Sequence, residues 1–319
     1  MAVSWRAVAL VALGVLPVLL VPTPLTVVLW SLLVVLLCLV DLALAASPRA
    51  ITVTRSVPRS VRLTTATSST IVLRNASPRR LRGTVRDAWQ PSAGATANRH
   101  AVDVPAGESR RLVTTLVPTR RGDRLADRVT VRAFGPLGLA ARQSSAAVPG
   151  RLRVLPEFAS RRHLPSRLAR LREMDGRTAV QVRGAGTEFD SLREYVIGDD
   201  VRSIDWRATA RRSEVVVRTW RPERDRRVLI VLDTARTSAG RIDDMPRIDA
   251  SMEAALLLAA LASKAGDRVD LIAYDRKVRA QVAGTSGPRL MPALADAMAP
   301  LEPALVETDW PGVVTAVQA

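Results

Sequence analysis

The first 46 residues differ from the rest of the chain because they are almost wholly apolar. One apolar run covers residues 3–21 and a second covers residues 25–46, with Arg6 and Asp41 as their only charged residues. Pro22-Thr23-Pro24 separates the two runs. A helix needs about 20 apolar residues to cross the hydrocarbon core of a bilayer. The pattern therefore predicts a two-helix transmembrane hairpin over residues 1–47, with a second span of full length and a shorter first span.

The competing interpretation is a cleaved signal peptide, because Ala43-Leu44-Ala45 would serve as a small-residue cleavage site. Two long apolar runs before that site argue against it, since the apolar region of a signal peptide is short. Arg6 lies at the start of the first run, before its uninterrupted apolar part, Arg49 and further arginines follow the second run, and the turn between the runs has no cation. The positive-inside rule then predicts a multi-pass protein of the cell membrane with both termini in the cytoplasm. Asp41 lies near the end of its span and is expected at the interface.

From Ile51 onward the apolar positions recur with period two. Short β-branched or alternating runs start near residues 51, 61, 69, 81 and 128, and turn sequences such as Asn75-Ala76-Ser77-Pro78 separate them. Several short strands at this spacing predict a β-sandwich over residues 48–155. The segment Phe134-Gly135-Pro136-Leu137-Gly138-Leu139 is expected to form a loop before the last strand.

The C-terminal part alternates strand and helix patterns. The apolar run 227–233 ends in Asp233, a helical pattern covers residues 248–265, further strands are expected at 267–274 and 277–282, and a second helix at 290–298. This order predicts an α/β domain with a parallel sheet over residues 227–319, preceded by an irregular segment over 156–226. Ligands of such sheets bind at the carboxyl ends of the strands, where Asp233 would lie.

Charge and composition narrow the function classes. The chain has a formal net charge of +17, yet residues 47–150 alone carry +13, with 18 arginines and 5 acidic residues, whereas residues 228–319 carry −3. Of the 47 basic residues 45 are arginine, a bias typical of a GC-rich genome. Aromatic residues are only 3%, few for stacking on bases, so a nucleic-acid partner is unlikely. One cysteine and two histidines exclude a disulfide framework and a multi-cysteine zinc site.

Residues 183–212 interleave acidic residues, arginines and glycines. This mixture favours internal ion pairs that organise an irregular segment, with Leu192, Tyr195, Val196, Ile204 and Trp206 packing inward. A hydrolase built on Glu188, Asp199, Asp200 and Asp205 is an alternative, which would require these carboxylates to converge with raised pKa values. No lysine follows the glycines at the spacing of a phosphate-binding loop.

This segment resembles a large bacterial family known only as domain-of-unknown-function family 58. The resembling positions are Gly186, Glu188, Phe189, Arg193, Tyr195, Gly198, Asp199, Asp200, Arg202, Asp205, Trp206, Thr209 and Arg211. The resemblance implies a membrane protein with a β-sandwich, this signature segment and a von Willebrand factor A-like domain. It also implies a non-enzymatic role beside MoxR-type AAA+ ATPases in assembling or activating other protein complexes.

The von Willebrand factor A-like fold often carries a metal-ion-dependent adhesion site of the pattern Asp-x-Ser-x-Ser. By this resemblance Asp233 matches the Asp, Ala235 replaces the first Ser, Thr237 stands for the second, and Thr308 resembles the Thr of the second metal loop. The resemblance thus implies a degenerate Mg²⁺ site with one hydroxyl fewer. Only about half of such a domain precedes Ala319, so the domain is expected to be C-terminally incomplete.

The leading hypothesis is a non-enzymatic, membrane-anchored adaptor or assembly factor that docks an AAA+ ATPase and a client protein complex through its cytoplasmic domains. The alternative is a basic β-sandwich that binds anionic lipid or nucleic acid in a salt-dependent manner. The identities of the client and the ATPase, the oligomeric state and the use of the metal site stay open at this stage.

Overall fold

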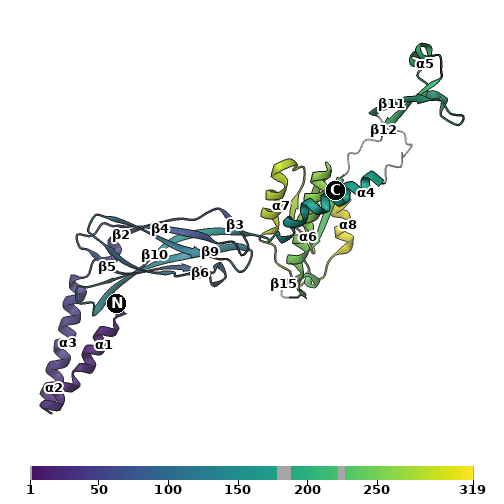
Figure 1. Ribbon diagram of the computed structural model, residues 1–319. Coiled ribbons are helices and arrows are strands. Elements are labelled where there is room, and N and C mark those ends of the chain that lie inside the picture. The colour runs from purple at the N-terminus through teal and green to yellow at the C-terminus, as the bar shows by residue number, and fades with distance from the viewer. Residues whose placement is uncertain (1, 178–187, 222–226, 244, 319) are drawn as a thin grey trace. The chain divides into compact units, whose positions relative to one another are not determined.

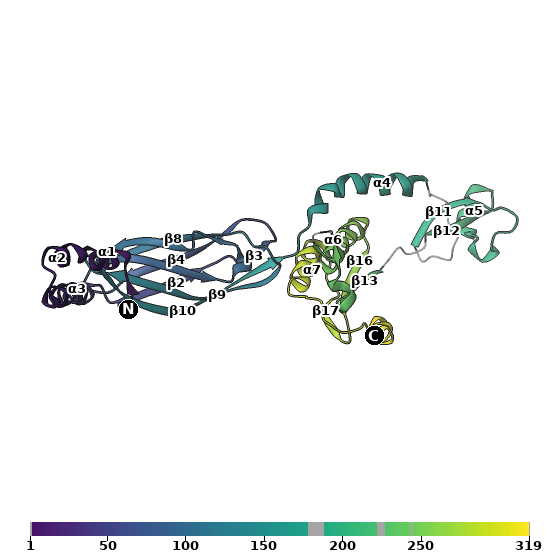
Figure 2. The same cartoon turned by 90° about the horizontal axis from the view of Figure 1, so that it is seen from below.

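The computed structural model of the chain describes residues 2–177, 188–221, 227–243 and 245–318. It divides into two compact units (Figures 1 and 2). The first comprises Met1–Glu157 with Met298–Leu301, and the second comprises Phe158–Ala297 with Glu302–Ala319. Each unit is described separately below.

The N-terminal apolar runs form a helical hairpin. Its helices are α1 (Trp5–Leu13), α2 (Val15–Leu20) and α3 (Pro24–Leu44). Thr23 caps α3, because its side chain accepts a hydrogen bond from the Thr26 N–H at 3.3 Å. A Cβ at Gly14 would lie 2.4 Å from the indole of Trp30, so the helices approach closely only because residue 14 is a glycine. The Trp30 indole donates to the Leu10 carbonyl at 3.2 Å and joins the helices.

The prediction of two membrane spans is supported for one of them. The apolar stretch Pro24–Ala50, which contains α3, is long and apolar enough to cross a membrane. Its mean hydropathy is 2.8, and few of its residues are buried. The first stretch, Trp5–Leu20, is shorter than a full span. The described residues thus contain one candidate membrane-spanning helix near the N-terminus.

The predicted β-sandwich fold is confirmed, because the strands form two sheets. One sheet has the order β1-β10-β9-β5-β7, with β3 paired to β10, and the other has the order β2-β4-β8-β6. The strands are β1 (Ala2–Val3), β2 (Ile51–Ser56), β3 (Ser60–Arg62), β4 (Thr67–Asn75), β5 (Leu81–Trp89), β6 (Ala95–Thr96), β7 (Arg99–Val104), β8 (Ser109–Leu116), β9 (Gly122–Phe134) and β10 (Ala140–Leu155). The expected loop at residues 134–139 connects β9 to β10.

Period-two alternation places the apolar side chains between the two sheets. In β4 the residues Ser69, Ile71, Leu73 and Asn75 are buried while their neighbours are more exposed. The main core cluster is drawn from both sheets and includes the fully buried Ile71, Leu73, Leu81, Val85 and Val129. Most arginines take the exposed positions of this alternation, and many are paired: Arg151 and Arg153 both bind Asp123, at 2.6 and 3.0 Å.

Arg55 is an exception because its side chain lies inside the sandwich. The Arg55 guanidinium contacts Asp87 at 2.5 Å, and the two side chains are only 1% and 0% exposed. Asp87 also accepts the Trp89 indole N–H at 2.9 Å, and Arg55 lies 5.3 Å from the centre of the Trp89 rings. Burial lowers the pKa of Arg55, and the charge of Asp87 opposes this shift.

Asp41, predicted to lie at the membrane interface near the end of its span, is fully buried against the sandwich. Its carboxylate accepts backbone N–H groups from Leu137 at 2.7 Å, Leu139 at 2.7 Å and Ala140 at 2.9 Å. The loop that supplies these donors is 96 to 99 residues away in sequence, so the neighbours of Asp41 in the chain gave no sign of the contact.

The second unit contains a three-stranded sheet of order β13-β16-β17. β13 (Arg227–Asp233) and β16 (Arg268–Tyr274) are parallel, as predicted, and β17 (Val278–Val282) is antiparallel to β16. The helices are α6 (Arg247–Ala265), α7 (Leu290–Met298) and α8 (Trp310–Gln318). α6 ends at Gly266 in the left-handed region with φ 90°, which lets the chain turn into β16. Val313 of α8 packs on Ile272 and Tyr274.

The remaining elements of this unit precede β13. Helix α4 (Leu164–Arg177) follows a 3-10 turn, in which Ser160 donates from its hydroxyl and its backbone N–H to Glu253 of α6, at 2.6 and 2.8 Å. β11 (Glu188–Glu194) and β12 (Val216–Arg221) form an antiparallel hairpin, and α5 (Trp206–Arg212) lies between them in sequence.

Candidate functional site

The candidate site is centred on Asp233, the last residue of β13. The apolar run Val228–Leu232 fixes this strand in the sheet and leaves the carboxylate at its carboxyl end, the edge at which ligands of parallel sheets bind. Two hydroxyl groups, one near in the sequence and one far, reach the carboxylate. Thr237 donates to one oxygen at 2.8 Å, and Thr308, 75 residues away, donates to the other at 2.8 Å.

Two further donors complete the set around this carboxylate. The Ala235 N–H donates to Asp233 at 3.0 Å, and the Ser238 hydroxyl contacts its carboxylate at 3.1 Å and its carbonyl at 2.7 Å. Ser238 is buried, and the sequence pattern did not identify it. The structure therefore brings together all three predicted metal-site residues, Asp233, Thr237 and Thr308, and adds a third hydroxyl.

Backbone hydrogen bonds hold the loops of the site against one another. The Ala304 N–H donates to the Thr234 carbonyl at 2.8 Å, and the Arg236 N–H donates to the Val306 carbonyl at 2.8 Å. These two bonds join the loop after β13 to the loop that carries Thr308. The position of the Thr308 hydroxyl is thus set by the fold.

Asp275 is a second carboxylate at the same edge of the sheet, and sequence reasoning missed it. It directly follows β16, as Asp233 ends β13, and it is 2% exposed. It accepts the N–H groups of Arg276 and Lys277 at 2.6 and 3.2 Å and an Arg279 guanidinium at 3.1 Å. The position of Asp275 directly after an apolar strand could have identified it from the sequence. Its bonds show that it shapes the turn after β16.

The electrostatics keep Asp233 ionised. Burial alone would raise the pKa of Asp233, but the N–H and hydroxyl donors around it outweigh burial and leave this pKa below the ordinary value. The donor set is one carboxylate and three hydroxyls, and hard oxygen ligands of this kind suit Mg²⁺. No cluster of three or more His, Cys, Asp or Glu side chains with metal-binding geometry occurs among the described residues. A cation here would depend on the hydroxyl groups.

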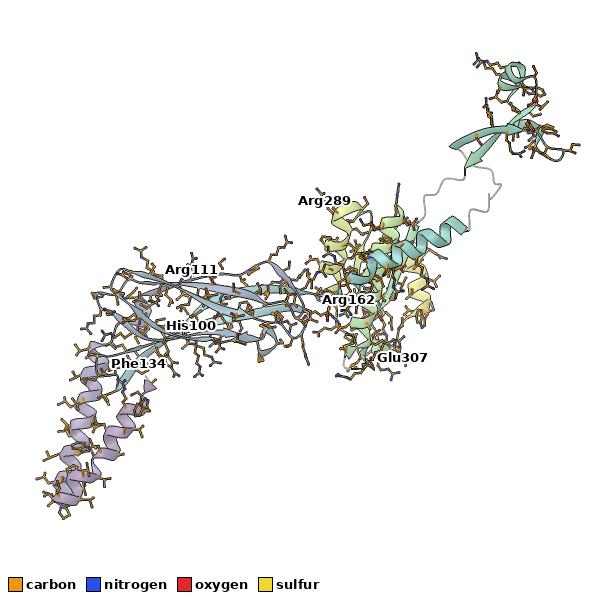
Figure 3. All side chains as sticks on the ribbon, viewed as in Figure 1. His100, Arg111, Phe134, Arg162, Arg289 and Glu307 are labelled. Atoms are coloured by element: carbon orange, nitrogen blue, oxygen red, sulfur yellow. The ribbon has the colours of Figure 1, made fainter. Side chains whose placement is uncertain are left out.

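The rim of the site is charged and exposed. Arg236 and Glu307 form an ion pair at 3.1 Å, with side chains 64% and 78% exposed. Figure 3 shows Glu307 at the surface of the α/β part. An exposed pair of this kind contributes little to stability, so both side chains are available to a partner.

The signature segment is organised by bonds within itself. Arg193 binds both oxygens of Asp199, at 2.7 and 2.6 Å, and Asp199 also accepts the Val196 N–H at 2.9 Å. This pair lowers the free energy of a turn that passes through Gly198, whose φ of 109° is accessible to glycine. Tyr195 adds a backbone bond to the Val215 carbonyl at 2.8 Å.

Asp205 and Asp200 act as helix caps. Asp205 accepts the N–H groups of Arg207 and Ala208 at 3.0 Å each and pairs with Arg218 at 2.8 Å. The two backbone N–H groups and the Arg218 guanidinium together lower the pKa of Asp205. Asp200 accepts the Arg202 N–H at 2.9 Å and begins a 3-10 turn.

The remaining signature residues are placed as follows. Thr209 accepts the Val216 N–H at 3.2 Å, and Arg211 is exposed. The inward packing expected of Trp206 and Val196 is wrong, since they are 69% and 58% exposed, because the short β11–β12 hairpin offers little surface to cover them. Glu188 and Phe189 lie in β11, and Gly186 lies outside the described residues.

These features define a protein with a candidate membrane-spanning helix, a β-sandwich and an α/β unit with an oxygen-rich site. Residues 191–318 match the family described as "Protein of unknown function DUF58". The match covers most of the signature segment and the α/β unit, and it supports the resemblance seen in the sequence. No curated protein matches this chain.

Several solved structures are similar to about a third of the chain. The CARDB domain of the PF1109 protein from Pyrococcus furiosus, crystallised with di-metal ions, shares 16% identity over 33% of this chain and 91% of that chain, with a TM-score of 0.25. A chain from the complex of zinc 2-glycoprotein and prolactin inducible protein from human seminal plasma shares 13% identity over 33% and 92%, with a TM-score of 0.25. A β-glucosidase from Listeria innocua shares 15% over 33% and 16%, with a TM-score of 0.21.

Proposed function

We propose that this chain is a non-enzymatic, membrane-anchored adaptor that binds a partner protein through a Mg²⁺-dependent site at Asp233. The observation that carries the proposal is the convergence of the Thr237 and Thr308 hydroxyls on the two oxygens of one carboxylate. A site of this composition leaves coordination positions that a partner's carboxylate can fill.

We interpret the α/β unit as the N-terminal half of a von Willebrand factor A-like domain. The parallel pair of β13 and β16, the antiparallel edge strand β17 and the acidic residue at the end of β13 support this interpretation. β13 is an edge strand of the described sheet. Val231 on this strand is 41% exposed.

Within the metal site, Asp233, Thr237 and Thr308 would hold the ion, and Ser238 would supply the hydroxyl that Ala235 lacks. When bound, Mg²⁺ would act as a bridge to a carboxylate of the partner. The partner class, an AAA+ ATPase of the MoxR type with a client protein complex, comes from the family resemblance. Arg236 at the rim fits an acidic side chain on such a partner.

The membrane anchor is α3, and the arginines outside the apolar runs support a cytoplasmic location for both termini. We further propose that α1 and α2 pair with α3 as a second, shorter span in the cell membrane. The contact between Gly14 and Trp30 supports this pairing.

The test uses the full chain in nanodiscs of phosphatidylcholine. Mg²⁺ binding is measured by calorimetry, and partner capture from detergent-solubilised membranes is measured with Mg²⁺ or with EDTA. We expect Thr308→Val to weaken Mg²⁺ binding at least about ten-fold and to abolish Mg²⁺-dependent capture. Thr315→Val is the matched control, because Thr315 donates only to Pro311 within α8. Equal capture with EDTA, or recovery of no ATPase or complex subunit, would contradict the proposal.

Two alternatives have less support. A hydrolase built on the signature carboxylates needs free groups with raised pKa values, but Asp199, Asp200 and Asp205 are bound by arginines or backbone N–H groups, and the pKa of Asp205 is lowered. General binding of lipid or nucleic acid by the whole basic sandwich needs unpaired cations over its surface. Several of those arginines instead contact carboxylates, as Arg151 and Arg153 share Asp123.

A further inference from the structure

The loop of residues 135–139, between β9 and β10, joins the end of the sandwich to the helices. Asp41, in the last turn of α3, accepts three N–H groups from Leu137, Leu139 and Ala140. A Cβ at Gly135 would lie 2.1 Å from the Asp41 carbonyl oxygen and 2.2 Å from its carboxylate, so the loop reaches the helix only with glycine at this position.

The start of the chain is joined to the same loop. Ser4 donates from its hydroxyl to the Gly138 carbonyl at 2.6 Å and from its N–H to the Leu139 carbonyl at 2.9 Å. The preceding residues Ala2 and Val3 pair with the first residues of β10. The outer ends of α1 and α3 therefore meet the sandwich at one level, where Phe134 lies in Figure 3.

This level coincides with the surface of the bilayer if α3 spans it. The 21 residues of α3 extend about 31 Å at 1.5 Å per residue, which equals the hydrocarbon thickness of about 30 Å. Leu44 ends the helix at that boundary. The loops that follow, including residues 135–139, must then lie at the depth of the lipid headgroups.

Three exposed arginines gather at this level from distant parts of the sequence. Arg6 is in α1, its guanidinium 3.0 Å from the place a Cβ at Gly138 would occupy. Arg49 follows α3, and Arg79 lies in the β4–β5 loop, where its guanidinium donates to the Ala43 carbonyl at the end of α3. These three, here called the juxtamembrane arginines, have no carboxylate partner within the part of the chain that the structure describes.

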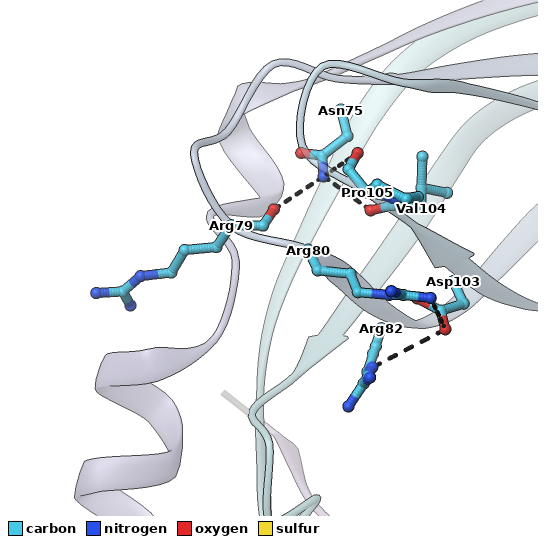
Figure 4. A network of polar contacts seen from close by, with 7 residues as sticks. All are labelled: Asn75, Arg79, Arg80, Arg82, Asp103, Val104 and Pro105. Carbon is cyan, nitrogen blue, oxygen red and sulfur yellow. Dashed lines mark hydrogen bonds and ion pairs between the residues drawn. The ribbon is translucent and has the colours of Figure 1, made fainter.

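Two arginines near Arg79 in the sequence differ from it because they lie beside a carboxylate. Arg80 is bound at 2.5 and 2.8 Å to Asp103, which also lies 3.9 Å from Arg82, as Figure 4 shows. Arg79 in the same view extends away from this network, beside α3. Arg80 is thus compensated by a carboxylate of the protein, whereas the neighbouring Arg79 at the end of α3 is left for an external anion.

Exposed apolar side chains accompany the juxtamembrane arginines. Trp5 at the start of α1 is 76% exposed and Leu137 in the loop is 45% exposed. Tryptophan favours the interface between headgroups and acyl chains. Cations can bind the anionic headgroups of a lipid surface, and apolar side chains of this kind can lie at the boundary with the acyl chains.

We propose that Arg6, Arg49 and Arg79 bind the headgroups of anionic phospholipids while Trp5 and Leu137 lie at the acyl boundary. This inference goes beyond the adaptor function and does not involve the site at Asp233. Each cation at such a surface contributes about 1 kcal/mol, which is about a five-fold change in affinity. Loss of all three should reduce retention of anionic lipid by about a hundred-fold.

The experiment measures lipids bound to the full chain by native mass spectrometry after detergent exchange with equal phosphatidylglycerol and phosphatidylcholine. We expect retained phosphatidylglycerol to fall in the triple variant Arg6→Gln, Arg49→Gln, Arg79→Gln. The matched control replaces Arg59, Arg86 and Arg99, which are exposed and unpaired in the described sandwich but lie away from the helix ends, by Gln. It carries the same change in net charge and should retain phosphatidylglycerol.

An equal loss in both variants, or no loss in either, would overturn the proposal. Competition by millimolar inorganic phosphate without dependence on the acyl chains would overturn it too, since the site would then be a phosphate site. The triple Arg→Lys variant guards against misfolding, because it keeps the charge and should recover most of the retention. Mg²⁺-dependent partner capture, measured in phosphatidylcholine, should be unchanged in all of these variants, so this proposal and the adaptor proposal fail separately.

Discussion

The clearest consequence of the structure concerns Asp41, whose carboxylate joins the candidate membrane-spanning helix to the sandwich. In Asp41→Asn the side chain keeps its shape but exchanges one acceptor oxygen for an N–H donor. One carboxylate oxygen accepts the Leu137 N–H, and the other accepts those of Leu139 and Ala140. The amide will turn so that only the Leu137 N–H loses its acceptor. That bond lies in a part-buried setting.

An unsatisfied buried N–H costs about 1–3 kcal/mol, and the two remaining bonds lose the assistance of the negative charge. We therefore expect the free energy of unfolding of the sandwich to fall by about 2–4 kcal/mol. A change of 1 kcal/mol shifts the melting temperature of a domain of about 100 residues by about 4–8 °C. The melting temperature should thus fall by roughly 8 °C or more.

The assay follows tryptophan fluorescence during heating of the full chain in detergent, with limited proteolysis near residue 137 as a second readout. Asp127→Asn is the matched control, since Asp127 is 68% exposed and pairs only with the adjacent Arg128. A melting temperature of Asp41→Asn within about 1 °C of that of the control would refute the reasoning. So would unchanged cleavage of the loop.

Three further predictions concern other buried or capping carboxylates. Hydrogen bonds, first from Arg153, lower the pKa of Asp123 from 3.8 to about 2. The contribution of Asp123 to stability is therefore present above pH 3.8 and is lost as the pH falls towards 2. Acid unfolding curves of Asp123→Asn should lack this loss of stability. Asp87→Ala leaves the Arg55 guanidinium buried without its counter-charge, so denaturant unfolding should show a loss of about 3–5 kcal/mol, largely restored when Arg55→Met is added. Asp205→Ala removes the cap of α5, and the amide protons at the start of that helix should exchange faster by NMR or mass spectrometry.

The sequence was most informative where a pattern was local. Alternation predicted the strands of the sandwich, and the apolar run ending in Asp233 predicted a carboxylate at the edge of a parallel sheet. Thr308 was found only through the family resemblance, because the chain gives no sign that residues 75 apart meet. Ser238 escaped notice because it stands one position after the expected hydroxyl, yet it contacts the same carboxylate.

Asp41 shows why a charge near the end of an apolar run is hard to place from sequence. Hydropathy measures the preference of a segment for lipid over water. The burial of the Asp41 carboxylate depends instead on a loop nearly one hundred residues away. The exposure of Trp206 is the converse case. An apolar residue such as Trp206 is expected in a core, but the hairpin that carries it is too small to bury it. Its side chain therefore stays exposed, which the local sequence did not indicate.

The same distinction explains what the net charge of +17 means for function. A total charge, and even a net charge of +13 on one domain, does not locate a binding surface, because it does not say which arginines the carboxylates pair with. What matters is which cations remain uncompensated. In the lipid proposal, the juxtamembrane arginines lack carboxylate partners in the described part of the chain and also lie next to the ends of the apolar helices. From the same end, β10 extends 16 residues, about 50 Å, to Leu155. If α3 spans a bilayer, the lipid charges would act on that end of the sandwich alone, because this distance exceeds the Debye length of about 8 Å several-fold.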